Sequence, residues 1–412
     1  MHGIRSSCAL VAALFAASLV ACSSSRTANG GGSSANGKTV AKIGIDLPVS
    51  GADASTGIPT RNGAILAIEE ANRAGTGLQF AAFDLDDAVG GAHDPGQGAQ
   101  NVRQFVADAS VLAMIGPFNS NVAAAEIPIT NDAGLAHISP ANTHTGLTKG
   151  DEAKRLRTSH PDTIAFFRVS TTDEHQGPAA AQYARKLGLL RAYVIDDDET
   201  YGTGVSAAFV DAYRQAGGTI LAHEHLFKGQ TDFKALLTKA AALHPDLVFF
   251  GGTTSTGGGL LRKQMGDSGM GDVAFMGGDG IGDAEFVRAA GNMANGSYYT
   301  VAAPDATHLP SAKAFVVTYE RRWHEPVGPY SANAYVATEI AIAAIRKAYV
   351  RSSPNLPARA DVLAGVASTH GFASPIGTIG FDRNGDTTAG ILSVYKVSGG
   401  APRFVDQITY KS

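Results

Sequence analysis

Two loops of this sequence carry groups that could hold an anion. In "IGPFNSNVAA", Asn119 and Ser120 stand directly before a helical pattern, where either side chain could be the N-cap. Free backbone N–H groups at such a helix start, helped by the helix dipole, favour a carboxylate or a phosphate. The next loop, "ISPANTHTGLT", adds N–H and hydroxyl donors at Ala141, Asn142 and Thr143. These loops predict the anion-binding side of a site.

Two further loops offer the opposite charge and an aromatic side chain. "FMGGDGIGD" presents Asp279 among glycines, and "DDETYGTG" places Tyr201 beside a glycine that lets the backbone come close. A donor-rich side and an acidic side together suit a zwitterion with separated charges, which is the shape of an α-amino acid. Each residue also has a plain structural explanation: Ser120 as a cap, Thr143 and Asp279 as turn residues, and Tyr201 as a packed aromatic.

The elements that must position these loops are short apolar runs alternating with helical patterns. "AKIGIDLP", "VLAMIGP" and "LAHISP" predict strands, and "RNGAILAIEEANRAG" and "GAQNVRQFVADA" predict helices. The rhythm restarts at "AFFRVS" and continues through "RAYVIDDD", "PDLVFFGG" and "VAFMGGDG". Strands that are apolar on both faces indicate parallel sheets covered by helices. The sequence therefore predicts an α/β chain with two lobes, and ligands in such sheets bind beyond the carboxyl ends of the strands.

Composition and missing motifs exclude several functions. A formal net charge of −4 gives no basic field for nucleic acid. "GGTTSTGGG" has the glycines of a phosphate-binding loop but lacks its Lys-Ser/Thr ending, and no G-x-S-x-G elbow is present. Because no nucleophile and base can be paired, we expect a binding protein and not an enzyme.

Three polar segments could invite a metal ion. "HEH" puts His223 and His225 on one face of a strand, but the sequence shows no third ligand nearby, and a solvated strand edge is the preferred interpretation. The acids of "DLDDAVGGAHD" are interpreted as turn and cap residues. "FDRNGD" lacks the glycine position and the bidentate Glu of a calcium loop, so it predicts a hairpin turn. We therefore expect no metal and no cofactor.

The N-terminus has the pattern of an export signal. Arg5 precedes an apolar run from Ala9 to Ala21 that is shorter than the roughly 20 residues needed to span a bilayer. The ending "LVAC" resembles the lipobox of bacterial lipoproteins, which implies cleavage before Cys22 and a diacylglycerol on its thiol. An ordinary signal peptide that happens to contain a cysteine is the alternative. We expect a signal peptide over 1–21, a lipidated Cys22 with a flexible linker over 22–38, and an extracytoplasmic protein anchored to the membrane by lipid.

From about Val40 to Lys396 the chain resembles the substrate-binding proteins of ABC importers for leucine, isoleucine and valine, which have the type I periplasmic binding protein fold. The resemblance is carried, in family order, by "LPVSGADASTG", "IGPFNS", "ISPANT", "TTDEHQGPAAAQYA", "DDETYGTG", "TDFKALLTKAAALHPDLVFFGG" and "FMGGDG".

The resemblance implies roles for individual residues. The groups that bind the ligand carboxylate fall at Ser120, Ala141 and Thr143. The acid that pairs with the ligand ammonium, commonly Glu in the family, falls at Asp279, and the Tyr that closes over the ligand falls at Tyr201. The side-chain pocket falls at Phe118, Asn119 and Tyr330.

Two departures from the family put the ligand in question. Family aromatics fall at Thr56 and Thr253, and Asn119 adds a polar group to the wall. A leucine, isoleucine or valine ligand is the expectation, and a larger or more polar amino acid or a short amide stays open, because hydrogen-bonding groups in a pocket reject ligands that leave them unpaired.

The resemblance also implies an architecture and partners. We expect two doubly wound parallel-sheet lobes joined by three hinge crossovers near Thr171, Ala302 and Ile376. One lobe would comprise 39–171 plus 302–376, and the other 172–301 plus 377–412. The expected partners are an amino acid and an ABC permease, with the chain a monomer. The alternatives are an amino-acid or amide sensor of the same fold and an extracellular hydrolase.

Overall fold

The computed structural model describes residues 39–75 and 77–410. The predicted signal peptide, Cys22 and the linker lie outside the described residues. Among the helices of the described part, none combines the length and the apolar character needed to cross a membrane.

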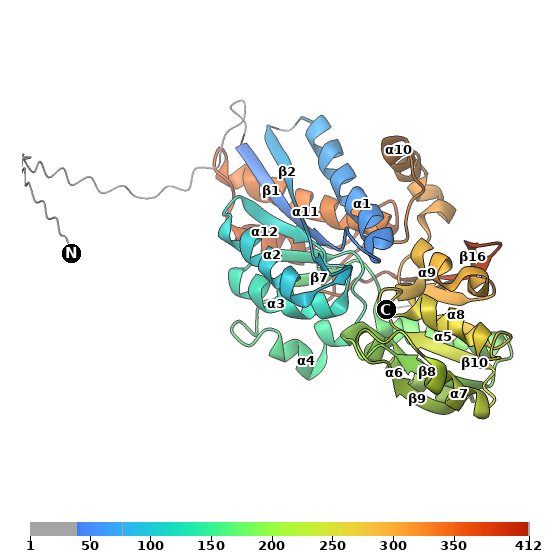
Figure 1. Cartoon of the computed structure of the whole chain (residues 1–412). Helices are drawn as coiled ribbons and strands as arrows, with labels where there is room; N and C mark the ends of the chain where they lie inside the picture. Colours follow the sequence, from blue (N-terminus) through green and yellow to red (C-terminus); the bar gives the residue numbers. More distant parts are fainter. Residues whose placement is uncertain (1–38, 76, 411–412) are drawn as a thin grey trace, which may run out of the picture. The chain divides into compact units, whose positions relative to one another are not determined.

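The first sheet has five parallel strands in the order β2-β1-β5-β6-β7. Figure 1 shows β1 and β2 side by side in this sheet. Strands β5 and β6 are buried along their whole length, which explains why their sequences are apolar on both faces. The strands are β1 (Thr39–Leu47), β2 (Leu78–Asp86), β5 (Val111–Ile115), β6 (Ala136–Ser139) and β7 (Phe166–Arg168).

The second sheet has seven strands in the order β16-β15-β12-β11-β10-β8-β9. Its five parallel strands follow the same order as those of the first sheet. In both sheets the second strand along the chain lies at the edge, and the first strand lies next to it. Two antiparallel strands extend the far edge. The strands are β8 (Arg191–Asp196), β9 (Thr219–His225), β10 (Leu247–Gly251), β11 (Ala274–Gly277), β12 (Tyr298–Val301), β15 (Gly390–Ser398) and β16 (Ala401–Tyr410).

Helices cover both faces of each sheet, as a doubly wound fold requires. On the first sheet, α1, α11 and α12 pack on one face and α2 and α3 on the other. On the second, α5 and α6 cover one face and α7, α8 and α9 the other. The helices are α1 (Ala54–Arg73), α2 (Pro95–Ala107), α3 (Ser120–Ala133), α4 (Gly150–Arg155), α5 (Asp173–Lys186), α6 (Thr200–Gln215), α7 (Lys234–Ala242), α8 (Gly258–Asp267), α9 (Ala284–Ala290), α10 (Lys313–Trp323), α11 (Ser331–Ser352) and α12 (Arg359–Ala367).

The predicted α/β class, with two doubly wound sheets, is confirmed, and the differences lie in individual elements. Helix α1 begins at Ala54, before the predicted start at Arg61, although Gly57 and Pro59 disfavour a helix there. Close packing explains why a glycine stands in this part of the helix, because a Cβ at Gly57 would lie 1.8 Å from the carbonyl oxygen of Pro48. Strand β12 was not predicted, since its four residues show no clear alternation.

The segment "FDRNGD" forms the predicted turn. Phe381 and Thr387 make an antiparallel bridge, and the Asp382 N–H donates to the Asp386 carbonyl at 2.8 Å. Two short hairpins stand apart from the main sheets: β3 (Ala88–Val89) with β4 (Ala92–His93), and β13 (Phe372–Ser374) with β14 (Gly377–Ile379).

The chain passes between the sheets three times: after β7, after β12, and between β14 and β15. The first two passages touch, because the Thr171 N–H donates to the Ala302 carbonyl at 3.0 Å. The β13–β14 hairpin spans residue 376, so we propose that the third crossover lies beyond this hairpin. The predicted lobe boundaries otherwise stay a proposal.

A buried ion pair ties the 382–386 turn to the first sheet. The fully buried Arg168 donates Nε–H to Asp386 Oδ1 at 2.7 Å and Nη1–H to the His144 carbonyl at 2.7 Å. Burial alone would raise the pKa of Asp386, but the charge and hydrogen bond of Arg168 outweigh it and hold that pKa below its ordinary value.

We expect Asp386→Asn to lower the free energy of unfolding by about 3–5 kcal/mol at neutral pH, because Arg168 would stay buried without its counter-charge. Since the folded pKa of Asp386 is depressed, this stabilisation is present above the unfolded pKa near 3.9 and is lost as pH falls below it. Urea unfolding measures the change.

Asp406→Asn is the matched control. It removes the exposed pair with Lys186, whose charged atoms lie 2.9 Å apart, and should cost at most about 1 kcal/mol. Equal costs for the two variants would contradict the assignment.

Candidate functional site

A small cavity brings together loops from the carboxyl ends of both sheets. Its empty volume is about 240 Å³. The lining residues are Phe118, Asn119, Ser120, Ala141 and Thr143 from the first sheet, and Tyr201, Thr253, Asp279 and Gly280 from the second. All except Gly280 are predicted site residues. The loops follow β5 and β6 in one sheet and β8, β10 and β11 in the other, where ligands of doubly wound sheets bind.

Asp279 is the charged centre of this cavity wall. Its Oδ1 accepts hydrogen bonds from Gln176 Nε2 at 2.6 Å and from the Tyr201 hydroxyl at 2.9 Å. Its Oδ2 accepts from the Tyr330 hydroxyl at 3.0 Å. Burial raises the pKa of Asp279 above its ordinary value, although each of these hydrogen bonds lowers it. A cationic group beside the carboxylate would favour its ionised form.

The glycines around Asp279 let the other loops approach it. A Cβ at Gly278 would lie 2.1 Å from the Tyr201 hydroxyl oxygen, and a Cβ at Gly280 would lie 2.2 Å from the carbonyl oxygen of Gly252. Both distances are too short for any side chain. The "GGDG" sequence therefore allows Tyr201 to reach the carboxylate.

The start of α3 supplies donors on the opposite wall. Asn119 is the N-cap residue, but its side chain makes no capping hydrogen bond, and its Oδ1 is buried without a partner among the described residues. The Ser120 hydroxyl oxygen accepts only a long hydrogen bond, of 3.4 Å, from the His144 N–H. The first-turn amides of a helix have no partner within the helix, and the dipole there attracts negative charge.

The loop after β6 is held in place mainly by Ser139 and Asn142. The Ser139 hydroxyl oxygen accepts the N–H groups of Ala141 at 3.2 Å and of Asn142 at 2.9 Å. The Asn142 side-chain amide donates to the Phe118 carbonyl at 2.8 Å, which ties the two loops together. Asn142 is therefore placed behind the cavity wall and not on it.

Thr56 and Tyr330 also lie outside the residues that line the cavity. Thr56 is on α1, where its hydroxyl donates to the Asp53 carbonyl at 2.9 Å. Tyr330 reaches the site through its hydroxyl on Asp279, and its ring packs edge-on against Phe118 at 5.5 Å between centroids. Thr253 lines the cavity as predicted, with its hydroxyl 2.9 Å from the Ser255 hydroxyl.

Sequence reasoning missed two buried residues of α5. Gln176 donates to Asp279, and also to the Thr300 carbonyl at 3.1 Å. The N–H of Asp173 donates to the Thr143 carbonyl at 2.8 Å. Burial raises the pKa of Asp173 to about 8, and the charge of Asp279 adds to the shift. The only signal in the sequence was their position in "TTDEHQGPAAAQYA", at the start of a helix that follows a strand.

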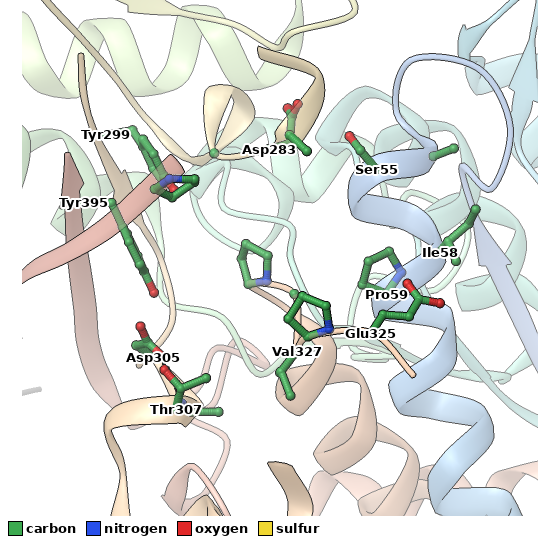
Figure 2. A pocket seen from close by; sticks show the side chains of 18 residues that line it. Ser55, Ile58, Pro59, Asp283, Tyr299, Asp305, Thr307, Glu325, Val327 and Tyr395 are labelled. Atoms are coloured by element: carbon green, nitrogen blue, oxygen red, sulfur yellow. Dashed lines mark hydrogen bonds between the residues drawn. The ribbon is translucent and has the colours of Figure 1, made fainter. Parts of the chain in front are cut away.

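A larger pocket, with an empty volume of about 1430 Å³, opens beyond the 279–284 turn (Figure 2). Figure 2 shows Tyr299 and Tyr395 on one side, where their rings stack at 5.1 Å, and Ile58 and Pro59 of α1 on the other. Its ionisable lining residues include three acids and no base: Asp283, Asp305 and Glu325. We place the site in the small cavity, because the predicted donor loops and the predicted acidic loop meet there.

A buried histidine links the two sides of the site. His93 Nδ1 lies 2.8 Å from Asp53 Oδ2, and His93 Nε2 lies 2.8 Å from Glu199 Oε2. Asn121 Nδ2 donates to the same Glu199 oxygen at 3.0 Å. Burial alone would lower the pKa of His93, but its two carboxylate partners raise it to about 10. The imidazolium therefore bridges the β3–β4 hairpin and the start of α6.

Comparisons with known proteins point to one family. A family model described as "Periplasmic binding protein" matches residues 40–401. A Leu/Ile/Val-binding protein of Rhizobium johnstonii is 30% identical over 360 residues, covering 87% of this chain and 92% of that protein. A leucine-, isoleucine-, valine-, threonine- and alanine-binding protein of Pseudomonas aeruginosa is 29% identical, covering 86% and 89%.

Solved structures agree with these relatives. The substrate-binding protein LivJ of a branched-chain amino acid transporter from Streptococcus pneumoniae, crystallised with isoleucine, matches with a TM-score of 0.76 at 26% identity. The match covers 91% of this chain and 100% of that one. The leucine-binding protein LivK of Thermotoga maritima matches with a TM-score of 0.77 at 25% identity, covering 90% and 99%.

We expect His93→Gln to lower the free energy of unfolding by about 3–5 kcal/mol near pH 6, because Asp53 and Glu199 would face each other without a cation between them. The folded pKa of about 10 lies above the unfolded value near 6.5. This stabilisation is therefore complete below about pH 6.5 and is lost as pH rises through about 10. Denaturant unfolding of wild type and variant at both ends of this range measures the difference.

The control for this prediction is His308→Gln, which removes a half-exposed imidazole whose Nδ1 lies 3.0 Å from Asp305 Oδ2. It should change stability by at most about 1 kcal/mol. A cost of His93→Gln that does not shrink at high pH would show that the imidazolium makes no ionic contribution.

Proposed function

The chain belongs to the periplasmic binding protein family, and on that premise we propose that it captures a branched-chain amino acid in the small cavity and delivers it to an ABC permease. The observation that carries this proposal is the placement of the buried Asp279 carboxylate across one cavity from the start of α3. The two walls present a negative charge and a set of N–H donors, which match the two ends of an α-amino acid.

The ligand ammonium is assigned to Asp279. A buried carboxylate is costly without a counter-charge, and the hydroxyls of Tyr201 and Tyr330 with the Gln176 amide reduce that cost only in part, since burial still raises the pKa of Asp279. An ammonium group would add charge-assisted hydrogen bonds in a site that excludes water, where such bonds are strong.

The ligand carboxylate is assigned to Ser120 and the 141–143 loop. Ser120, the first residue of α3, lines the cavity, and the dipole at a helix N-terminus attracts an anion. The Ala141 N–H contributes less than the sequence implied, because it already donates to Ser139 at 3.2 Å.

The ligand side chain is assigned to the space beside Phe118 and Tyr201, with Tyr330 behind them. The related proteins are named for leucine, isoleucine and valine, so a compact apolar side chain is the first ligand class to test. Asn119 and Thr253 place polar groups in the same wall, so a polar amino acid or a short amide is the second ligand class to test.

The transport cycle that we propose follows from the topology. The two sheets move about the segments near Thr171 and Ala302 and the third passage beyond the β13–β14 hairpin. Closure brings Asp279 and Tyr201 over a ligand seated at Ser120, and the closed form docks on a permease whose energy comes from a separate ATPase. The transporter proteins named above favour this role over sensing.

We also propose that the chain is exported and held at the membrane by lipid on Cys22. The support is the pattern of residues 1–22: Arg5, a short apolar run and a terminal "LVAC". Two or more acyl chains give lasting attachment, at about 0.8 kcal/mol for each buried CH₂ group. We propose further that the protein acts as a monomer.

We expect Asp279→Asn to weaken the binding of leucine, isoleucine or valine by about a hundredfold or more, close to 3 kcal/mol, because the ammonium would be buried without a counter-charge. Isothermal titration calorimetry measures the dissociation constant. Glu325→Gln is the matched control, since it removes an acid from the wall of the larger pocket and should leave the affinity unchanged. If Glu325→Gln weakens binding and Asp279→Asn does not, the ligand occupies the larger pocket and the assignment fails.

For the lipid anchor, Cys22→Ala should move the protein from the membrane fraction to the soluble fraction, or leave it unprocessed. Fractionation, with mass spectrometry of the N-terminus, measures both outcomes. A processed variant that stays fully in the membrane would rule out lipidation at Cys22.

A further inference from the structure

Two histidines on the edge strand of the second sheet converge on one carboxylate. Successive side chains of a strand point to opposite faces, so His223 and His225 of β9 share a face. In the parallel pairing of β8 with β9, Asp196 is the register partner of His225, and His223 is the partner of Val194. The end of β8 therefore brings Asp196 up to both imidazoles.

The contacts are close and involve different oxygens of the carboxylate. His223 Nε2 lies 2.6 Å from Asp196 Oδ2, and His225 Nδ1 lies 2.6 Å from Asp196 Oδ1. One ligand atom from each of the three residues lies within 4.8 Å of the other two. The Asp196 side chain is fully buried, whereas those of His223 and His225 are 30% and 56% exposed. The cluster thus has one buried carboxylate and two imidazoles that solvent can reach.

The backbone holds Asp196 in place. Its Oδ1 also accepts the Asp198 N–H at 3.0 Å, and its carbonyl accepts the Leu226 N–H at 2.7 Å. Such supporting hydrogen bonds orient the ligands of metal sites. One oxygen of this carboxylate is therefore held by the backbone as well as by His225.

We propose that Asp196, His223 and His225 form a binding site for a divalent late transition-metal ion such as Zn²⁺ or Ni²⁺. Two imidazole nitrogens and one carboxylate oxygen are a ligand set that these ions accept, and the solvent-exposed side of the cluster leaves room for water or an added ligand in the remaining positions. Mg²⁺ and Ca²⁺ prefer all-oxygen sites and do not match two imidazoles. The sequence did not reveal this site, because Asp196 is far from "HEH" along the chain.

Binding requires only a small movement. Metal–nitrogen and metal–oxygen bonds of about 2.0–2.2 Å in tetrahedral geometry separate two ligand atoms by roughly 3.3 Å. The nitrogen–oxygen distances must therefore open from 2.6 Å by some tenths of an ångström, as the metal replaces the two shared protons. Both imidazoles are partly exposed, so each has solvent beside it into which the ring can turn.

The surrounding charges favour a cation. Asp198 follows Asp196 by two residues and adds a negative charge beside the cluster, whereas Glu224 points to the other face of β9, where it lies 3.5 Å from Lys239. No residue of the cluster lines the small cavity, so metal binding does not depend on the proposed amino-acid site.

Isothermal titration calorimetry of the full-length protein with NiCl₂ or ZnCl₂ tests the proposal, with MgCl₂ as the comparison ion. We expect one strong site for each chain with Ni²⁺ and Zn²⁺, and none with Mg²⁺. His225→Ala should weaken the affinity at least about tenfold, and the double variant His223→Ala/His225→Ala should abolish the strong site. His370→Ala, which removes an exposed histidine outside the cluster, should change nothing.

A second measurement identifies the ligands directly. Co²⁺ bound to the wild type should give visible absorption bands of a low-coordinate site with nitrogen ligands, and the double variant should lack them. Circular dichroism verifies that each variant is folded, and both substituted positions lie on an edge strand with solvent-exposed side chains. A wild type without a strong site, or a folded double variant that binds as tightly as the wild type, overturns the proposal.

Discussion

Burial of the Asp279 carboxylate is the constraint on which the rest of the site depends. An ionised carboxylate taken out of water must be compensated, and here three donors from three different elements do so in part: Gln176 of α5, Tyr201 of α6 and Tyr330 at the start of α11. Since those elements are spread over much of the chain, the carboxylate can be accommodated only after the second sheet, its helices and the returning α11 have packed together. The same burial raises the pKa of Asp279, and a cation beside the carboxylate would favour its ionised form.

The repeated winding of the two sheets explains why the cavity lies where it does. In both sheets the second strand along the chain lies at the edge, and the first strand lies next to it. The loops at the carboxyl ends of β5 and β6 in one sheet, and of β8, β10 and β11 in the other, line the same cavity. The sequences of these loops are adapted to close approach. Any Cβ at Gly278 or Gly280 would collide with Tyr201 or with the backbone at Gly252.

Two buried ionic contacts hold the loops around this volume. Arg168 fixes the 142–148 segment through its carbonyls and hydroxyl and ties it to Asp386, which lies more than two hundred residues later in the chain. His93 connects Asp53, beside the start of α1, to Glu199 at the start of α6. Both contacts join segments that come from different parts of the sequence, so both form only when those distant segments have packed together.

The sequence by itself determined the alternation of strands and helices, the α/β class and the loops that carry the site, because apolar periodicity and glycine turns are local signals. It predicted Ser120, Tyr201 and Asp279 as site residues, and these three line one cavity, because each follows the carboxyl end of a strand closely along the chain. Only the tertiary structure decided that Gln176 joins Asp279, that Asn142 lies behind the wall, that α1 begins at Ala54, and that Asp196 meets His223 and His225. These features depend on strand register and on contacts between distant segments, which are set by how the whole core packs and leave no trace in the local pattern.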